Sequence, residues 1–216
     1  MLRRKTTTER FRLPMTYPQA VDFITAAYMS EVESRHCNYI ADTPTLQHID
    51  RVAQWLTSPR PKFGMLLCGQ CGNGKSTLAR AVRSTVHYLN GNDYGENSKL
   101  VMLVDAKDIC EAAKKDYTQF KKLARHELLI IEDLGIEPSE VLDYGNVLNP
   151  AVDLLAKRYD DQLFTIVTTN LTPQKIREHY GDRIADRFNE MMERIVFTNS
   201  TYRKNDNSTA PQELNR

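Results

Sequence analysis

One short motif restricts the fold of this chain more than any other part of its sequence. Residues 69–76 match the pattern G-x-x-x-x-G-K-[ST] at every position. An apolar run at residues 65–68 precedes the motif, and the helical spacing of Leu78, Ala81 and Val82 follows it. A strand that leads through such a loop into a helix directs backbone N–H groups and the positive end of the helix to one point. The motif therefore predicts a binding site for the phosphates of a nucleoside triphosphate.

The residue types of this loop have separate physical roles. Its glycines allow the tight curl that turns the backbone N–H groups toward phosphate oxygens. We expect Lys75 to reach the β- and γ-phosphates and the Ser76 hydroxyl to ligate Mg²⁺. A glycine-rich turn without a ligand is the alternative. The predicted cofactors are ATP and Mg²⁺, and the predicted nucleotide contacts are Gly69, Gln70, Cys71, Gly72, Asn73, Gly74, Lys75, Ser76 and Thr77.

From residue 61 onward, short apolar runs alternate with helical segments. Strands that are apolar on both faces, each followed by a helix, are typical of a parallel sheet covered on both sides. We therefore predict an α/β fold, a three-layer sandwich around a five-stranded parallel sheet. The runs expected to form its strands lie at residues 65–68, 100–104, 128–131, 164–167 and 195–197.

Two helices are expected before the sheet. The first runs from Pro18 to about Arg35 with Thr16 as its cap, and the second begins at Thr43-Pro44 with Thr43 as its cap. The prolines of the segment 58–61 mark the end of this region. The predicted domains are a flexible basic arm at 1–16, a short N-terminal helical preface at 17–60, the ATPase core at 61–203 and a disordered tail at 204–216.

Composition and charge exclude several classes of protein. The formal net charge of +1 predicts no strong bulk attraction to nucleic acid or to a membrane, so any such attraction must come from local clusters. The longest strongly apolar runs are about four residues long, whereas a membrane span needs about twenty. The basic start at residues 1–5 is followed by no apolar stretch, so we predict no secretory signal and a cytoplasmic protein.

Cys68 and Cys71 form a Cys-x-x-Cys pair, which is found in redox sites and in half of some zinc sites. Alternatively, they lie at a strand end and inside the phosphate loop with no such role. Neither Cys37 nor Cys110 supplies a second close pair, and this favours the second interpretation.

Two acidic residues, Glu132 and Asp133, directly follow a predicted strand. At the carboxyl end of a parallel sheet such residues emerge beside the phosphates. We predict that Glu132 holds Mg²⁺ through its water shell and that Asp133 polarises the attacking water. Another predicted strand ends at Asn170, which we expect to orient this water. Alternatively, Asn170 or Thr172 only caps the following helix.

From about Trp55 to Arg203, the sequence resembles the AAA+ ATPases of the DnaC-type helicase loader and IstB-type transposition helper family. The resemblance rests on the phosphate loop and on residues 129–135 (LIIEDLG), 169–170 (TN), 180–188 (YGDRIADRF) and 200–203 (STYR). It implies an AAA+ core of the P-loop NTPase class. It also implies a role for four residues: Asn170 as sensor 1, Arg187 as an arginine finger in trans, Arg183 as its companion and Arg203 as a sensor-2-like contact.

The spacing of the two arginines agrees with this assignment. Arg183 and Arg187 are four residues apart and therefore lie on one face of a helix. A guanidinium group is suited to spread the charge of a transferring phosphoryl group. A surface of ion pairs with Asp182, Asp186 and Glu190 is the alternative.

The resemblance also has consequences for assembly and rate. Only 19 residues follow Phe197, so we expect no C-terminal lid domain. The site would then depend on neighbouring subunits, which predicts a homo-oligomer formed with nucleotide. Glu132 stands where the family usually has Asp, and Asp133 stands where many AAA+ proteins have Glu, so we expect slow hydrolysis. The preface is short compared with typical loaders, which leaves the partner open.

A basic segment is the candidate contact for nucleic acid. Tyr117 and Phe120 lie among its basic residues, and such a mixture can follow a phosphate backbone and stack on single-stranded bases. A solvated amphipathic helix is the equal alternative. The candidate DNA contacts are Lys114, Lys115, Lys121, Lys122 and Arg125.

The sequence thus predicts an ATPase that oligomerises on single-stranded DNA and delivers or remodels a partner, either a replicative helicase or, in a mobile element, a transposase. An ATP-gated scaffold with little hydrolysis is a second possibility. A small-molecule kinase is a third, and it leaves the arginine pair without a role.

Overall fold

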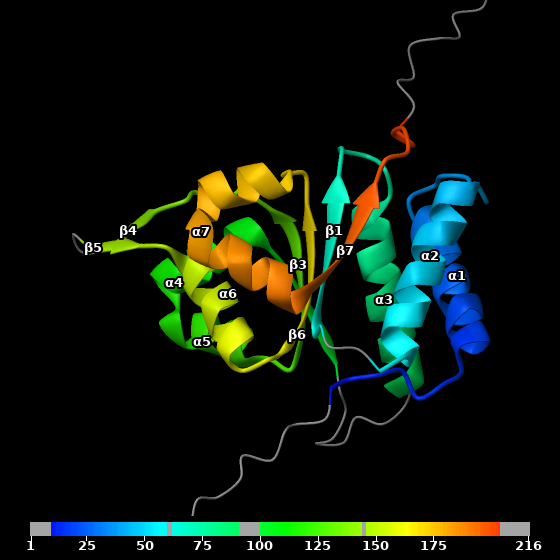
Figure 1. The fold of residues 1–216 in the computed structure, drawn as a ribbon, viewed down its shortest axis with the longest axis horizontal. Coiled ribbons are helices and arrows are strands. Elements are labelled where there is room, and N and C mark those ends of the chain that lie inside the picture. The colour runs from blue at the N-terminus through cyan, green and yellow to red at the C-terminus, as the bar shows by residue number, and fades with distance from the viewer. Residues whose placement is uncertain (1–9, 60–61, 91–99, 144–145, 204–216) are drawn as a thin grey trace, which may run out of the picture.

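The computed structural model describes residues 10–59, 62–90, 100–143 and 146–203. Residues 1–9 of the predicted basic arm and the whole predicted tail at 204–216 lie outside these residues. The prediction of a flexible arm is wrong for residues 10–16, because Leu13 is buried in the core and its N–H donates to the Leu56 carbonyl at 2.9 Å. Five parallel strands form the central sheet in the order β2-β3-β6-β1-β7 (Figure 1). They are β1 (Gly64–Gly69), β2 (Val101–Asp105), β3 (Leu128–Leu134), β6 (Phe164–Thr169) and β7 (Met192–Phe197). The predicted α/β fold with a five-stranded parallel sheet is confirmed.

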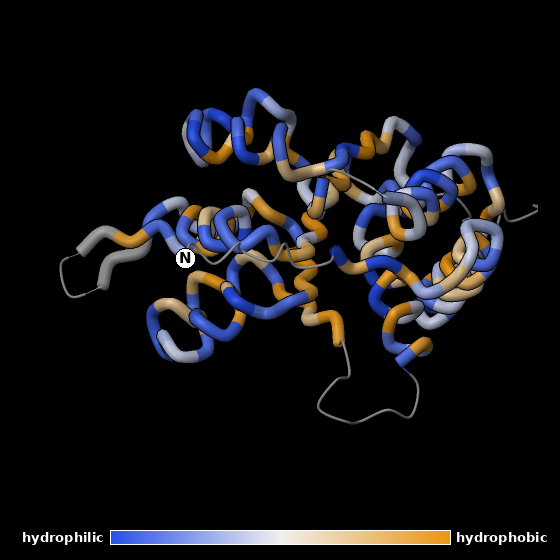
Figure 2. Tube along the Cα trace, turned by 60° about the horizontal axis from the view of Figure 1, so that its bottom comes forward, coloured by the Kyte–Doolittle hydropathy of each residue, from blue (hydrophilic) through white to orange (hydrophobic). Residues whose placement is uncertain are grey.

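Each face of the sheet has its own apolar core, and successive residues of a strand contribute side chains to the two cores in turn. In β3, Leu129 and Ile131 pack on one side, whereas Leu128 and Ile130 pack on the other. This period of two follows from the pleat of an extended strand. Because both faces are buried, the strands carry the most hydrophobic stretches of the chain (Figure 2).

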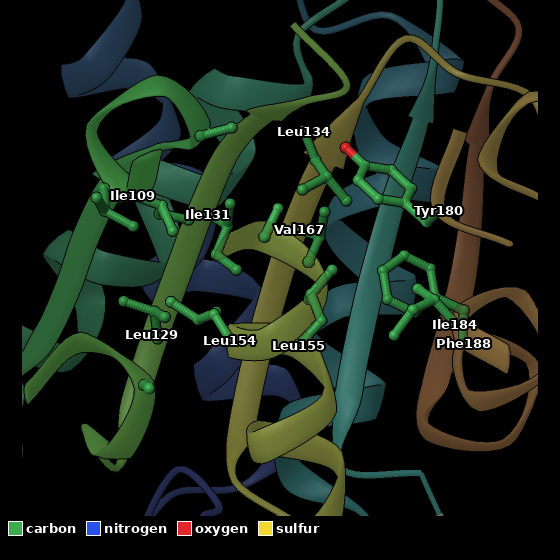
Figure 3. Packing of buried hydrophobic residues seen from close by; sticks show 14 of the residues in the cluster. Ile109, Leu129, Ile131, Leu134, Leu154, Leu155, Val167, Tyr180, Ile184 and Phe188 are labelled. Atoms are coloured by element: carbon green, nitrogen blue, oxygen red, sulfur yellow. The ribbon is translucent and has the colours of Figure 1, made fainter. Parts of the chain in front are cut away.

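Four helices cover one face of the sheet. They are α4 (Ala106–Lys115), α5 (Tyr117–Arg125), α6 (Pro150–Asp160) and α7 (Pro173–Met191). Leu154 and Leu155 of α6 meet Leu129 and Val167 of the sheet in this layer (Figure 3). Gly181 interrupts α7 with φ 81° and ψ 168°, a conformation that is almost restricted to glycine. The helix therefore changes direction just before Arg183.

Three helices cover the other face. They are α1 (Tyr17–Glu33), α2 (Thr43–Thr57) and α3 (Lys75–Asn90), so the two preface helices belong to the same core as the sheet (Figure 1). Thr16 caps α1 in a capping box with Gln19, as predicted. The prediction that Thr43 caps α2 is wrong. The cap is Asp42, whose side chain accepts the hydrogen bond from the Thr45 N–H. Among the described helices, none is both long and apolar enough to cross a membrane.

A small hairpin was not predicted from the sequence. Its strands β4 (Val141–Asp143) and β5 (Asn146–Leu148) pair antiparallel outside the main sheet. The hairpin follows β3 and projects away from the body of the molecule (Figure 1). It lies between the acidic residues and α6.

Candidate nucleotide-binding site

The carboxyl ends of the five strands meet at one edge of the sheet, and a cavity of about 310 Å³ lies there beside the loop between β1 and α3. The cavity gathers residues from α1, the phosphate loop, the ends of β3 and β6, and the segment after β7. They are Tyr28, Val32, Arg35, Cys37, Cys71, Gly72, Asn73, Gly74, Lys75, Ser76, Thr77, Asp133, Ile136, Asn170, Tyr202 and Arg203. Of the predicted loop residues, Gly69 and Gln70 do not line it.

Close packing explains why the loop requires glycine at Gly69 and Gly72. Both have positive φ, 148° and 79°, in which a side chain is strained. A Cβ at Gly69 would lie 2.4 Å from the Phe197 carbonyl oxygen, and one at Gly72 would lie 2.2 Å from Thr201 Oγ1. Asn73 donates a hydrogen bond of 3.1 Å to the same Phe197 carbonyl. The loop is therefore held against the end of β7.

Lys75 is buried at the start of α3, and its ammonium group faces the loop. It donates hydrogen bonds to the carbonyl oxygens of Gly69 (2.9 Å) and Gln70 (2.6 Å) and to Asn73 Oδ1 (3.1 Å). Desolvation lowers the pKa of Lys75, and the charge of Asp133 acts in the opposite direction. The three acceptors keep the ammonium group pointing into the loop.

The charges of the cavity suit a polyanion with a hard cation. Three of its lining residues, Arg35, Lys75 and Arg203, are cationic, whereas Asp133 is its one acidic lining residue among those described. The Ser76 hydroxyl and the Asp133 carboxylate are oxygen ligands of the kind that Mg²⁺ prefers. The residues present therefore fit a nucleotide with its magnesium ion.

The two acidic residues after β3 do not share one environment. Asp133 has a positive φ of 52°, its backbone N–H donates to Thr168 Oγ1 at 3.0 Å, and it lines the cavity. Glu132 is only 5% exposed and does not line the cavity. Instead, its carboxylate accepts three hydrogen bonds of 2.6–3.2 Å from the guanidinium group of Arg80 on α3.

Asn170 follows β6, is exposed and lines the cavity. The cap of α7 is Thr172, whose hydroxyl accepts a hydrogen bond from the Lys175 N–H at 3.2 Å. Thr169, the preceding residue, bonds to the Leu134 carbonyl and fixes the end of β6 against the end of β3. Of the two caps considered from the sequence, Thr172 has this role, and the Asn170 side chain faces the cavity.

Arg183 and Arg187 of α7 have different surroundings, and neither lines the cavity. Arg187 bonds to Asp160 at 3.1 Å and lies over the ring of Tyr159, 4.6 Å from its centroid, so that its side chain is only 13% exposed. Arg183 is exposed. Arg187 is therefore held by contacts within its own chain, whereas Arg183 projects from the surface.

The segment after β7 closes the cavity and ties it to the preface. The Tyr202 N–H donates to the Gly72 carbonyl at 2.8 Å, and the Tyr202 hydroxyl bonds to Asp42 (2.7 Å) and Thr45 (2.9 Å) of the α2 start. Arg203 reaches the Cys71 sulfur at 3.3 Å. The sequence places Tyr202 in the 200–203 stretch of the resemblance but predicts no contact for it, because its partners lie up to 160 residues away.

The four cysteines, all within the described residues, are free thiols. Cys68 is buried under the loop, and Cys71 is exposed in it. Desolvation raises the pKa of Cys68, which makes this thiol less nucleophilic. The environment of Cys68 thus agrees with the structural interpretation of the Cys-x-x-Cys pair.

The five candidate DNA contacts lie on α4 and α5 and are all exposed. Phe120 belongs to the core, whereas Tyr117 is 60% exposed and stacks on it with a centroid distance of 5.8 Å. Lys121 lies 4.9 Å from the centroid of the Tyr117 ring. One aromatic ring and several cations therefore share this surface, although Lys115 is paired with Glu111.

Comparisons with known proteins agree with the geometry of the cavity. The sequence model of the family described as "IstB-like ATP binding protein" matches residues 40–210, which include the phosphate loop, both acidic residues and Arg203. No curated protein sequence matched the chain.

Several solved structures share the fold. The DnaC helicase loader has a TM-score of 0.57 at 19% identity, over 74% of this chain and 93% of that chain. For DnaI the TM-score is 0.58 at 20% identity, over 76% of this chain and 87% of that chain. The replication initiator DnaA bound to AMPPCP and single-stranded DNA gives 0.52 at 16% identity, over 73% and 48%. At these identities the likeness concerns the fold alone.

Proposed function

Because the chain belongs to the family of IstB-like ATP binding proteins, we propose that it is an ATPase that assembles on single-stranded DNA and delivers or remodels a replicative helicase. The family match and the P-loop fold make it an ATP-binding AAA+ protein. Hydrolysis, DNA binding and the partner belong to the proposal. Its main support is the cavity at the strand ends, where the phosphate loop, an acidic residue and an asparagine lie together.

Each cavity residue has a chemical task in this proposal. Bound Mg²⁺ would neutralise charge on the phosphates and be ligated by Ser76. Lys75 turns from the loop carbonyls to the β- and γ-phosphates. Asp133 and Asn170 hold and polarise the attacking water, since both face the cavity. Arg203 binds phosphate oxygens from the side of the last segment.

Assembly supplies the charge that one subunit lacks. No arginine of α7 lines the cavity of its own subunit, which is the arrangement expected if the α7 arginines act on a neighbour. In this proposal the exposed Arg183 faces the γ-phosphate bound by the next subunit of a homo-oligomer. Arg187 joins it only after leaving Asp160 and Tyr159. An arginine in this position is worth about 10³–10⁵ in turnover.

Single-stranded DNA is proposed to bind along α4 and α5. The exposed cations Lys121 and Lys122, together with Tyr117, support this surface, and a solved structural relative, DnaA, is described as bound to single-stranded DNA. Both helices cover the same face of the sheet as α7. DNA and the proposed subunit contact therefore involve one layer of the molecule.

The proposal is tested by ATP hydrolysis with and without single-stranded DNA. Turnover that rises with DNA and is lost in Lys75→Ala supports an ATPase that works on DNA. Lys121→Glu/Lys122→Glu should lower DNA affinity and flatten its salt dependence, whereas the same reversal at Lys157, on another helix, serves as the control. Unchanged DNA binding in the double variant would remove this surface from the interface.

Two alternatives have specific support. The family is named for IstB-like proteins, so a transposase is the second candidate partner. Co-purification with the helicase or with the transposase of the same genome separates the two. The pairing of Glu132 with Arg80 favours a scaffold with little hydrolysis, and Lys75-dependent nucleotide binding without turnover, even with DNA and partner, would identify it.

A further inference from the structure

Arg80 lies on α3, four residues after Ser76, and therefore on nearly the same face of the helix one turn farther along. Its Nε lies 3.0 Å from Glu132 Oε1 and 3.2 Å from Oε2, and its Nη2 lies 2.6 Å from Oε2. Both carboxylate oxygens are thus held by one guanidinium fork, which is the strongest geometry for such a pair.

Burial makes this pair more than a surface contact. The Glu132 side chain is 7% exposed, and that of Arg80 is 41% exposed. Glu132 emerges on the α3 side of β3 because it continues the alternation of Leu128 and Ile130. Burying a carboxylate without a partner carries a large desolvation free energy, so Glu132 is stabilised by any cation that can reach it.

Two cations can fill that need. One is Arg80, and the other is the metal ion that accompanies a nucleotide at Ser76, one helical turn away. A carboxylate whose charge is balanced by a guanidinium group attracts a second cation much less. Arg80 and Mg²⁺ are therefore alternatives for the charge of Glu132.

We propose that the Arg80–Glu132 pair is a latch that competes with Mg²⁺ for Glu132, so that Arg80 sets how strongly nucleotide binding depends on the metal. The proposal rests on the proposed function, since it requires a metal–nucleotide complex at the phosphate loop. In the free protein the latch is closed and stabilises the end of β3. Metal-bound nucleotide opens it and frees the guanidinium group toward solvent.

The test is the affinity for a fluorescent ATP analogue, measured in EDTA and at increasing Mg²⁺ concentrations. Arg80→Gln keeps the length of the side chain and removes its charge. In EDTA its affinity should match that of the wild type, whereas the Mg²⁺ concentration for half-maximal effect should fall by about tenfold. Arg83→Gln on the same helix is the matched control, because Arg83 bonds to the Val101 carbonyl and not to Glu132.

A second readout does not depend on turnover. Arg80→Gln leaves Glu132 buried and unpaired, so the nucleotide-free variant should unfold at a lower temperature than the wild type. Adding Mg²⁺ and nucleotide should then raise the unfolding midpoint of the variant by more than it raises that of the wild type. Arg80→Lys keeps the charge but not the guanidinium fork, so its unfolding midpoint should lie between those of the wild type and Arg80→Gln. It also serves as the test variant if Arg80→Gln does not fold.

Glu132→Gln identifies the residue through which Arg80 acts. In the Glu132→Gln background, the Arg80→Gln change should no longer alter the Mg²⁺ dependence. An equal Mg²⁺ response in wild type and Arg80→Gln would overturn the latch, and so would a weaker response in Arg80→Gln, which would mean that Arg80 positions Glu132 for the metal. If the wild type binds no nucleotide, or if Lys75→Ala binds it equally well, the proposed function is overturned instead.

Discussion

At the scale of single residues, Arg158 shows how a buried charge holds two elements together. It has no exposed surface, and desolvation lowers its pKa to about 9, so it stays charged at neutral pH. Its guanidinium group donates to the carbonyls of Leu123 (3.3 Å), His126 (2.8 Å) and Phe164 (2.6 Å). It thereby supplies a buried donor to carbonyls at the end of α5 and at the start of β6.

We expect Arg158→Leu to be among the most destabilising changes in the core. Several buried carbonyls would lose a charged donor, so the free energy of unfolding should fall by about 3 kcal/mol or more. That corresponds to a fall of about 6–12 °C in the unfolding midpoint. Lys157→Ala, which removes a half-exposed ion pair with Asp161 on the same helix, should change stability by about 0.5 kcal/mol at most. Equal midpoints for the two variants would contradict this role of Arg158.

At the scale of elements, the sequence predicts the sheet well because buried parallel strands are continuous apolar runs. Each predicted run lies within or overlaps one of the five strands of the sheet. The hairpin β4–β5 could not be found in this way, since each strand is only three residues long. In the candidate site, the local sequence pattern predicts the phosphate loop and Asp133, which the structure brings to one cavity. The Arg80–Glu132 and Tyr202–Asp42 contacts join residues that are far apart in sequence, so only the folded chain reveals them.

The packing of α2 on β7 predicts a dependence of stability on pH. His48 of α2 stacks on Phe197 with a centroid distance of 3.9 Å. Desolvation lowers the pKa of His48, the Val196 backbone opposes this, and the charge of Arg51 adds to it. The unfolded chain, with a histidine pKa of about 6.5, therefore binds a proton that the folded chain resists. The stability from neutral His48 is complete above pH 6.5 and is lost as the pH falls through the folded-state pKa.

Unfolding midpoints at pH 7.5 and pH 5.5 check this expectation. His48→Gln should reduce the difference between the two midpoints, although part of it should remain because burial also lowers the pKa of His87. His36→Asn, at an exposed position, is the control and should leave the difference unchanged. A wild-type protein that becomes more stable at the lower pH would show that other groups dominate.

At the scale of the whole molecule, Arg183 and Arg187 of α7 differ in what they contact: Arg187 is bound within its own chain, and Arg183 is exposed on the surface. Arg187 is engaged by Asp160 and Tyr159, whereas Arg183 follows the kink at Gly181 and is exposed. Arg183 is therefore the more accessible of the two for a neighbour's nucleotide. The resemblance of the sequence implied Arg187 for this task.

We expect Arg183→Ala to change stability by less than about 0.5 kcal/mol and to lower hydrolysis by the assembly about 10³-fold. Arg187→Ala should lower the unfolding midpoint as well, because it removes contacts inside the subunit. Mixing Arg183→Ala with Lys75→Ala subunits should restore part of the turnover, since one variant binds ATP and the other offers the arginine. Loss of hydrolysis in Arg187→Ala alone, at an unchanged midpoint, would assign the finger to Arg187.

The position of β7 also imposes an order in time on the growing polypeptide. The phosphate loop is synthesised early, but Asn73 finds its acceptor in Phe197, 124 residues later, and β1 needs β7 as one of its two neighbours. A ribosome must therefore translate nearly the whole described region before the loop acquires its final shape. A product truncated before β7 would carry the complete motif but would lack the Phe197 acceptor of Asn73 and two residues of the cavity lining, Tyr202 and Arg203.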